Sequence, residues 1–229
     1  MWHTPDMGTL SIVATPIGNL EDITLRALRT LKECDVIYAE DTRVISKLLS
    51  RYEIQKPLQR LDAATEAKKA DDVIARLEAG ERIVFVSDAG TPGISDPGTR
   101  LVAQVRTQLP DAVIEAIPGA SALTAALSIS GIDTAAFTFL GFLPHKKGRQ
   151  TALKSLATSE IPVVLYESPH RIEKLLEELK ELSVRHVVVA RELTKVHEEL
   201  ISGTVAELQA HFVAHPDAVR GEFVVIVTP

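Results

Sequence analysis

The sequence contains one cysteine, Cys34, so it has no intramolecular disulfide, and this scarcity favours a reducing compartment. No apolar run approaches the about 18 residues that a membrane-spanning helix needs. The first residues hold Pro5, Asp6 and Gly8 where a secretory signal would have an apolar run, so no signal peptide is expected. Together these absences predict a cytoplasmic protein without a membrane anchor.

An excess of positive charge is also missing. The formal net charge is −6, whereas domains that bind nucleic acid through their overall field are usually basic. Any contact with RNA must therefore come from local patches of Lys and Arg.

Several ligand-binding patterns are absent as well. The glycine-rich segments match neither the dinucleotide pattern G-x-G-x-x-G nor the phosphate-binding G-x-x-x-x-G-K-[ST], and none reads as an EF-hand loop. His170 and His197 have no companions at metal-ligand spacing. The sequence therefore predicts no resident metal ion.

Short apolar runs alternate with amphipathic segments in the first half of the chain. Its 229 residues exceed the about 100–150 of a usual single domain. Strands are expected at 9–15, 36–40, 82–87 and 112–117, and helical spacing of apolar residues is seen near 25–31, 73–77 and 101–105. This alternation predicts an α/β domain with a mainly parallel sheet.

The pattern changes after Pro118-Gly119. A helix of small residues is expected at 121–130, further helices at 149–157, 169–181 and 205–213, and strands at 137–142, 163–167, 185–191 and 222–227, with 197–205 as a strand or hairpin. We place the domain boundary here, giving domains 1–118 and 119–229.

Most glycine and proline lies where strands lead into helices, which is where open α/β sheets bind ligands. The loop 87–98 holds three glycines, two prolines and two aspartates, far more turn chemistry than a connection needs. Asp88 follows a strand directly and is available to a ribose or ammonium group. Asp96 precedes Pro97 and is expected to be a helix N-cap. Taken alone, the loop 14–20 fits a plain strand–helix turn better than a binding loop, and the loop 117–122 is better explained by tight helix packing.

Two basic patches stand out in this acidic chain. Arg43, Lys47 and Arg51 recur every fourth residue and so share a helix face, and His145–Arg149 forms a second patch. Both follow loops near the expected ligand-binding edge, so contact with phosphates and a merely solvated surface both remain open. The polar segments Glu167–Arg171 and Arg191–Lys195 are equally ambiguous.

Taken together, six segments resemble one known family. They are Ala14–Thr24, Ala39–Arg43, Ser87–Gly98, Gly141–Pro144, Tyr166–Arg171 and Arg191–Lys195. In this order and spacing they are similar to the ribosomal RNA small-subunit methyltransferase I family, a branch of the tetrapyrrole methylases. The resemblance covers about residues 9–228.

The resemblance implies a two-domain α/β fold with a mainly parallel N-terminal sheet and a mixed C-terminal sheet. It implies S-adenosylmethionine bound in a cleft to which both domains contribute, with the N-terminal domain on the substrate side, and usually a homodimer. The implied reaction is 2′-O-methylation of a cytidine ribose in the decoding region of 16S rRNA. Members of the family typically continue for several tens of residues after the last strand, whereas this sequence ends at Pro229.

Alignment with that fold assigns candidate residues. Cofactor contacts are expected at Pro16, Ile17, Ser87, Asp88, Thr91, Ser121, Ala122, Glu167 and Leu193. Glu40 and Asp41 are the candidates for accepting the 2′-hydroxyl proton, with Glu167 and Lys195 as second choices. A neutral Lys195 would need a pKa lowered by burial. Phosphate contacts are expected at Arg43, Lys146, Lys147, Arg149, Arg171 and Arg191.

Two rival functions remain. A C-methyltransferase acting on a corrin or porphyrin precursor would have the same fold, but the segments Glu40–Arg43 and Arg191–Lys195 favour the RNA branch. A non-catalytic ribosome-associated or cofactor-sensing protein is the rival of another class, and the intact loops speak against it.

Overall fold

The computed structural model describes residues 7–228. Residues 1–6 lie outside the described residues, and the expectation that the chain begins without a signal peptide concerns this segment. The chain divides into two compact units, Met1–Ser121 and Ala122–Pro229. Among the described residues, no helix is long and apolar enough to cross a membrane.

The first unit is built on a five-stranded sheet in which every pairing is parallel. The strand order is β3-β2-β4-β1-β5, from β1 (Thr9–Val13), β2 (Val36–Ala39), β3 (Leu58–Arg60), β4 (Arg82–Val86) and β5 (Val113–Ile117). Buried Val, Ile, Leu and Phe dominate the central strands, as expected of a sheet covered on both faces.

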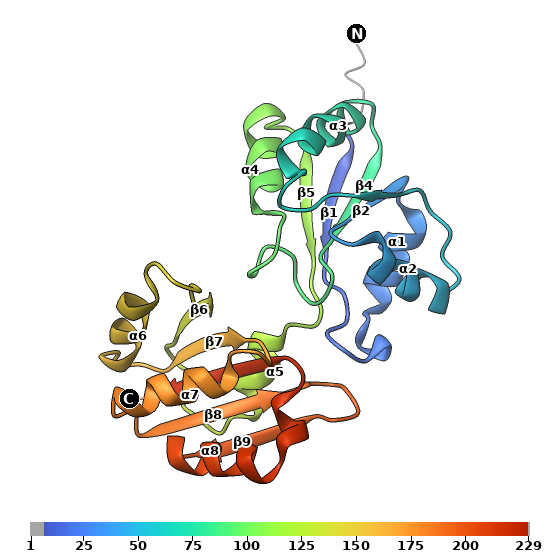
Figure 1. Ribbon diagram of the computed structural model, residues 1–229. Helices are drawn as coiled ribbons and strands as arrows, with labels where there is room; N and C mark the ends of the chain where they lie inside the picture. Colours follow the sequence, from blue (N-terminus) through green and yellow to red (C-terminus); the bar gives the residue numbers. More distant parts are fainter. Residues whose placement is uncertain (1–6, 229) are drawn as a thin grey trace. The chain divides into compact units, whose positions relative to one another are not determined.

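Helices cover both faces of this sheet (Figure 1). They are α1 (Leu25–Glu33), α2 (Thr42–Arg51), α3 (Glu66–Glu78) and α4 (Thr99–Gln108), with a short 3-10 helix, η1 (Leu20–Asp22), before α1. The apolar sides of α1 and α2 share one core cluster with β2 and β4, and those of α3 and α4 share another with β1 and β4. Each helix therefore exposes a polar outer face.

The second unit contains a mixed five-stranded sheet, ordered β6-β7-β10-β8-β9. Its strands are β6 (Thr138–Phe142), β7 (Val163–Glu167), β8 (His186–Arg191), β9 (Glu199–Gly203) and β10 (Phe223–Thr228). Only β6 and β7 pair in parallel; β10 is antiparallel to β7 and β8, and β9 to β8. The fold class expected from the sequence, a parallel sheet followed by a mixed one, is confirmed.

The helices of this unit are α5 (Ala122–Ile129), α6 (Arg149–Ala157), α7 (Ile172–Glu181) and α8 (Val205–Ala214), with η2 (Pro216–Val219) before β10. Residues of α6, α7 and α8 form one core cluster with β7, β8 and β10. Helix α7 begins at Ile172 instead of the expected Pro169, because the amides of Arg171 and Ile172 both bond to the Ser168 carbonyl in a preceding turn.

Candidate active site

The carboxyl ends of β1, β2, β4 and β5 lie at one edge of the first sheet, because these strands run parallel in register. The loops that leave this edge carry most of the residues expected to bind the cofactor. Those in the first unit are Pro16, Ile17, Ser87, Asp88, Thr91 and Ser121. The structure thus gathers them on one edge of one sheet.

Backbone hydrogen bonds join these loops. Thr15 and Gly90 exchange N–H···O bonds of 2.9 and 3.0 Å, and the Thr91 hydroxyl donates to the Ala120 carbonyl at 3.2 Å. Gly90 has φ +78°, and a Cβ there would lie 3.3 Å from Ile17 Cγ2. The loops therefore approach each other through backbone, which leaves amides and carbonyls to line the edge.

Asp41 is held as the N-cap of α2. Its carboxylate accepts from the Arg43 amide at 2.9 Å and forms an ion pair with the exposed Arg43 guanidinium at 2.5 Å. These bonds to Arg43 lower the pKa of Asp41 to about 2. Such a weakly basic carboxylate is a poor proton acceptor, so Asp41 suits a positioning role better than a catalytic one.

Glu40 has the opposite environment. Burial raises its pKa, and the neighbouring charges of Asp88 and Asp96 raise it further. Asp88 is itself anchored, because its Oδ1 accepts from the Asp41 amide at 2.8 Å. Of the two carboxylates expected from the sequence, Glu40 is therefore the better candidate for a general base.

Asp96 is not the N-cap of α4, so that expectation is wrong. Gly98 holds the cap position, and the buried Glu66 carboxylate of α3 accepts from the Gly98 and Leu101 amides at 3.1 and 2.9 Å. Asp96 instead bonds to Ser87 at the sheet edge, where burial raises its pKa to about 6. Glu66 lies 32 residues before Gly98, which is why no local pattern predicts this cap.

We expect Asp96→Asn to stabilise the protein at neutral pH. The Asp96 pKa is raised from 3.8 to about 6, so its contribution to stability is fully present below about pH 4 and is lost as the pH rises through 6. Asparagine keeps a hydrogen-bonding side chain without the charge. Thermal melts at pH 4.5 and 8 test this: the variant should melt higher than the parent at pH 8, and a difference that does not grow between the two pH values would contradict it.

In the second unit, Glu167 ends β7 as a buried carboxylate, 2% exposed. Its Oε1 accepts from the Ser168 amide at 2.8 Å and pairs with Arg171 Nε at 3.1 Å. Its Oε2 has no hydrogen-bond partner among the described residues. A buried, unpartnered acceptor calls for a donor, and a ligand hydroxyl, amine or ammonium group would supply one.

Three arginines that were expected to contact phosphates form hydrogen bonds and ion pairs within this unit. Arg149 is 5% exposed and pairs with Glu178 at 2.5 Å, and Arg191 is 9% exposed and donates to the carbonyls of Arg220, His197 and Asp217. Arg171 donates to the Leu143 carbonyl at 2.7 Å. In this conformation their guanidinium groups bond to neighbouring parts of the chain and stabilise its loops, and are not directed to solvent.

Lys146 and Lys147 differ, because both are exposed and neither forms an ion pair among the described residues. They are the cations of the 145–149 segment that remain available to an anionic partner.

The loop after β8 is held in an unusual conformation. Glu192 and Thr194 have φ of 48° and 64° on either side of Leu193, which is 7% exposed. Lys195 Nζ pairs with Glu192 at 2.8 Å and Glu222 at 2.9 Å. Burial lowers the pKa of Lys195, but these hydrogen bonds outweigh it and the net pKa is raised. These bonds favour the protonated form of Lys195, whereas a general base would have to be neutral.

Within residues 7–228, no three His, Cys, Asp or Glu side chains are grouped so as to hold a metal ion. The acidic groups at the sheet edge are thus not arranged as a metal centre.

Comparisons with known proteins place these features in context. Residues 9–209 match the model of the family Tetrapyrrole (Corrin/Porphyrin) Methylases. A ribosomal RNA small subunit methyltransferase I from Thermotoga maritima is 45% identical over 207 residues, covering 90% of this chain and 92% of that protein. The protein of the same name from Xylella fastidiosa is 46% identical, covering 96% of this chain and 81% of its own length.

Solved structures share the fold at low identity. The methyltransferase CobJ superposes with a TM-score of 0.71 at 20% identity, covering 96% of this chain and 94% of that chain. A uroporphyrin-III C-methyltransferase from Thermus thermophilus, complexed with S-adenosyl homocysteine, gives 0.64 at 17% identity, covering 96% and 97%.

Proposed function

Because this chain belongs to the tetrapyrrole methylase family and, within it, to the ribosomal RNA small subunit methyltransferase I proteins, we propose that it methylates the 2′-oxygen of a cytidine ribose in 16S rRNA. The decoding region is the proposed target, S-adenosylmethionine the methyl donor, and the cytoplasm the place of action. The observation that carries this proposal is the 45–46% identity to proteins of that name over nearly the whole chain.

The rival, C-methylation of a corrin or porphyrin precursor, rests on shared fold alone. Two solved structures, named as a cobalt precorrin-4 methyltransferase and a uroporphyrin-III C-methyltransferase, are each 19% identical to this chain.

The residues fit S-adenosylmethionine as cofactor. The sheet edge offers backbone amides and carbonyls at closely packed loops. In the second unit, Glu167 Oε2 is a buried acceptor without a hydrogen-bond donor among the described residues. The proposed contacts are Pro16, Ile17, Ser87, Asp88, Thr91 and Ser121 in the first unit and Ala122, Glu167 and Leu193 in the second. When bound, the cofactor supplies a methyl group on a sulfonium that is already a strong donor.

The chemistry asked of the side chains is then small. The chain must hold the ribose hydroxyl in line with the methyl group, which supplies much of the rate by orientation. The hydroxyl proton would pass to the Glu40 carboxylate as the ribose oxygen takes the methyl group and the sulfonium C–S bond breaks to leave S-adenosylhomocysteine. Its raised pKa makes this carboxylate a stronger base than an ordinary glutamate. Asp41 and Asp88 fix the backbone between Glu40 and α2.

Calorimetry tests the cofactor half of the proposal. S-adenosylhomocysteine should bind equally well with and without a chelator, because the proposed contacts include no metal. Asp88→Ala should weaken binding by about 1–3 kcal/mol if it removes a charge-assisted hydrogen bond. Lys174→Ala, an exposed change on α7, is the matched control and should leave affinity unchanged. Binding abolished by the chelator, or equal affinity in both variants, would contradict these assignments.

For RNA contact, Arg43, Lys146 and Lys147 remain the proposed phosphate ligands. We do not propose Arg149 and Arg191 as phosphate ligands, because both side chains are buried and bonded within the protein. Arg171 is likewise left out, because it forms an ion pair with Glu167. We also propose that the protein works as a homodimer, which light scattering on the purified chain would test.

Lys146→Gln/Lys147→Gln should weaken binding to 16S rRNA and reduce its salt dependence. Each lost phosphate contact lowers the slope of log K against log salt by about 0.7–0.9, so the pair should lower it by about 1.4–1.8. The control Lys174→Gln/Lys180→Gln removes the same charge from exposed positions on α7. Equal slopes for the two double variants would mean that the 145–149 segment is only solvated.

A further inference from the structure

Positive charge in this acidic protein is concentrated on two neighbouring helices. The exposed cations of α1 and α2 are Arg26, Arg29, Lys32, Arg43, Lys47 and Arg51. The only carboxylate within these helices is Glu33, and it pairs with Arg82 of β4 at 3.3 Å. Here we call the outer side of α1 and α2 the basic face.

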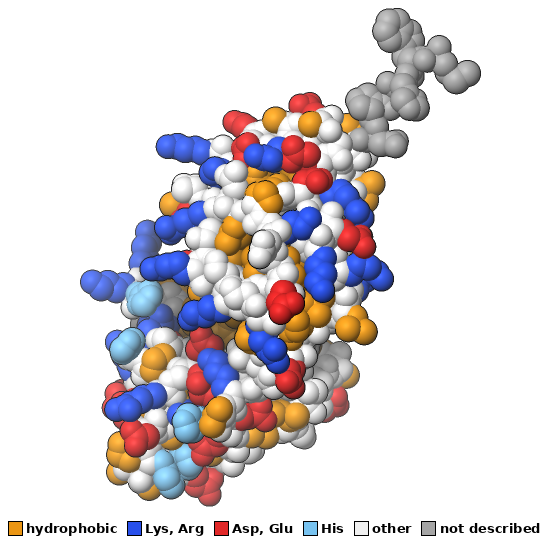
Figure 2. All heavy atoms as spheres, turned by 90° about the vertical axis from the view of Figure 1, so that its right-hand side faces the viewer, with side chains coloured by type: hydrophobic (Ala, Val, Ile, Leu, Met, Phe, Trp, Pro, Cys, Tyr) orange, Lys and Arg blue, Asp and Glu red, His pale blue; other side chains and the backbone are white. Residues whose placement is uncertain are grey.

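The topology makes this face continuous. Helices α1 and α2 follow β1 and β2, which run in the same direction, and their apolar sides share one core cluster. The Tyr52 hydroxyl at the end of α2 donates to the Leu20 carbonyl just before α1, at 2.7 Å. Figure 1 shows the two helices side by side, and Figure 2, turned to face that side of the molecule, shows many Lys and Arg side chains there with Asp and Glu side chains among them.

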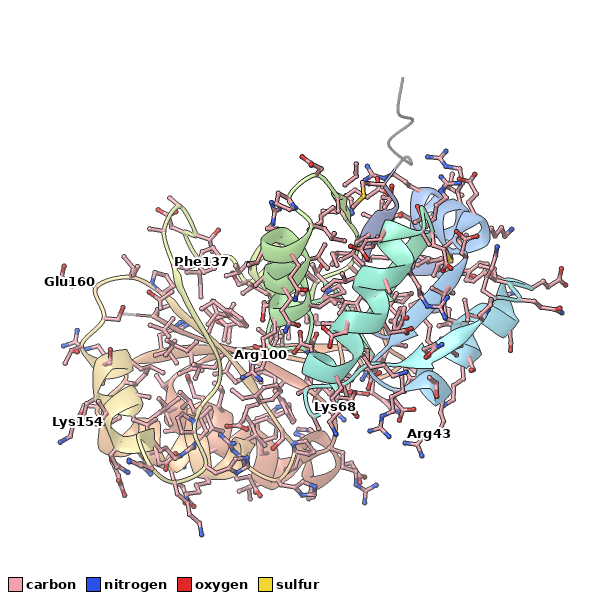
Figure 3. All side chains as sticks on the ribbon, turned by 90° about the horizontal axis from the view of Figure 1, so that it is seen from above. Arg43, Lys68, Arg100, Phe137, Lys154 and Glu160 are labelled. Atoms are coloured by element: carbon pink, nitrogen blue, oxygen red, sulfur yellow. The ribbon has the colours of Figure 1, made fainter. Side chains whose placement is uncertain are left out.

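Most of these cations are not neutralised by the protein. Within the described part of the chain, Arg29, Lys32, Lys47 and Arg51 form no ion pair. Arg51 lies over the Tyr52 ring at 5.8 Å, and Arg43, which points outward in Figure 3, pairs with Asp41. The two helices themselves therefore carry six cations against one carboxylate.

A solvated helix surface often carries both signs, although α4 and α6 of this chain also carry cations alone. Helices α3 and α7 carry both signs, and α3 contains the i,i+4 pair Arg76–Asp72. On the basic face, by contrast, residues four apart carry the same charge, as Arg43, Lys47 and Arg51 do. Like charges at this spacing destabilise a helix. An anionic partner would relieve this repulsion.

We propose that the basic face is an RNA-docking surface that binds phosphates beyond the target nucleotide. This inference rests on the proposed function and deepens it. Arg43 lies in the first turn of α2, three residues after Glu40, and the cations continue along both helices away from that edge. At 1.5 Å per residue, the row from Arg43 to Arg51 extends about 12 Å. That extent suits a polymer with many phosphates better than a small anionic substrate.

The test is Arg29→Gln/Lys32→Gln/Lys47→Gln, which spares Arg43 beside the site and Arg26, whose guanidinium donates to the Ala116 carbonyl. The control, Arg100→Gln/Arg106→Gln/Lys154→Gln, removes equal charge from α4 and α6; Figure 3 labels Arg100 and Lys154. Binding of 16S rRNA is measured across a salt series for both variants. The basic-face variant should lower the slope by about 2.1–2.7, and the control by much less.

S-adenosylhomocysteine affinity should be unchanged in both variants, and the basic-face variant should raise KM for RNA without lowering kcat. If the parent protein binds RNA with a salt-dependent affinity and both variants match it, the inference fails while the proposed function stands. If the parent binds RNA through this face without methylating it, the inference stands and the proposed function fails.

Discussion

Glu40→Gln is expected to lower kcat for methyl transfer by about 10²–10⁴-fold, the usual contribution of a general base. Glutamine keeps the size and hydrogen-bonding capacity of the side chain but does not accept the ribose proton. Because Glu40 is not among the proposed cofactor contacts, S-adenosylhomocysteine should bind the variant as tightly as the parent. Single-turnover rates at saturating RNA measure the effect without interference from product release.

Asp41→Asn is the matched control for Glu40→Gln. Asparagine also serves as an N-cap acceptor, so α2 should begin at the same residue. Since the pKa of Asp41 is held at about 2 by Arg43, its loss should cost far less activity than the loss of Glu40. A larger loss in Asp41→Asn than in Glu40→Gln would reverse the two roles.

The pH profile gives a second readout of Glu40. The carboxylate form is the active one, so the rate should rise with pH through the Glu40 pKa. Burial and the charges of Asp88 and Asp96 raise that pKa, which moves the rise above the pH of an ordinary glutamate.

Gly98→Ala should be among the most destabilising single changes in the first unit. Gly98 has φ +121°, and a Cβ there would lie 2.6 Å from Cε1 of the fully buried Phe85. Backbone strain of about 1–3 kcal/mol and overpacking of about 1–3 kcal/mol should add to a loss of about 2–6 kcal/mol. Urea unfolding followed by circular dichroism measures this free energy.

Gly131→Ala separates strain from overpacking. Gly131 also has a positive φ, +71°, but nothing lies within 4 Å of a Cβ placed there. Its alanine variant should lose only the about 1–2 kcal/mol of a left-handed alanine. Equal losses at positions 98 and 131 would mean that Phe85 moves aside and that its ring does not require the glycine.

The sequence predicts the elements that depend on local pattern. Strands such as β4 are continuous apolar runs and were expected within one residue of their observed ends. Strand β3, Leu58–Arg60, was not expected, because three residues with two polar side chains at a sheet edge carry no strand pattern. Its pairing comes from its parallel neighbour β2.

The chemistry of the site depends more on distant partners. Arg191 is typical of a phosphate ligand by residue type, yet it bonds to the Arg220 carbonyl 29 residues away. Arg149 is likewise paired with Glu178, also 29 residues away. Sequence spacing does not reveal such contacts, and so does not separate arginines that build loops from cations that face solvent. Exposure and bonding in the fold make that distinction for Lys146 and Lys147.

Methyl transfer from S-adenosylmethionine carrying a radiolabelled methyl group tests the central claim most directly. The protein is offered small ribosomal subunits, naked 16S rRNA and a porphyrin or corrin precursor in separate reactions, each with Glu40→Gln in parallel. The predicted result is label on the 2′-oxygen of a single cytidine of 16S rRNA, greatly slowed in the variant. Label in the tetrapyrrole alone, or on a base instead of a ribose, would contradict the account.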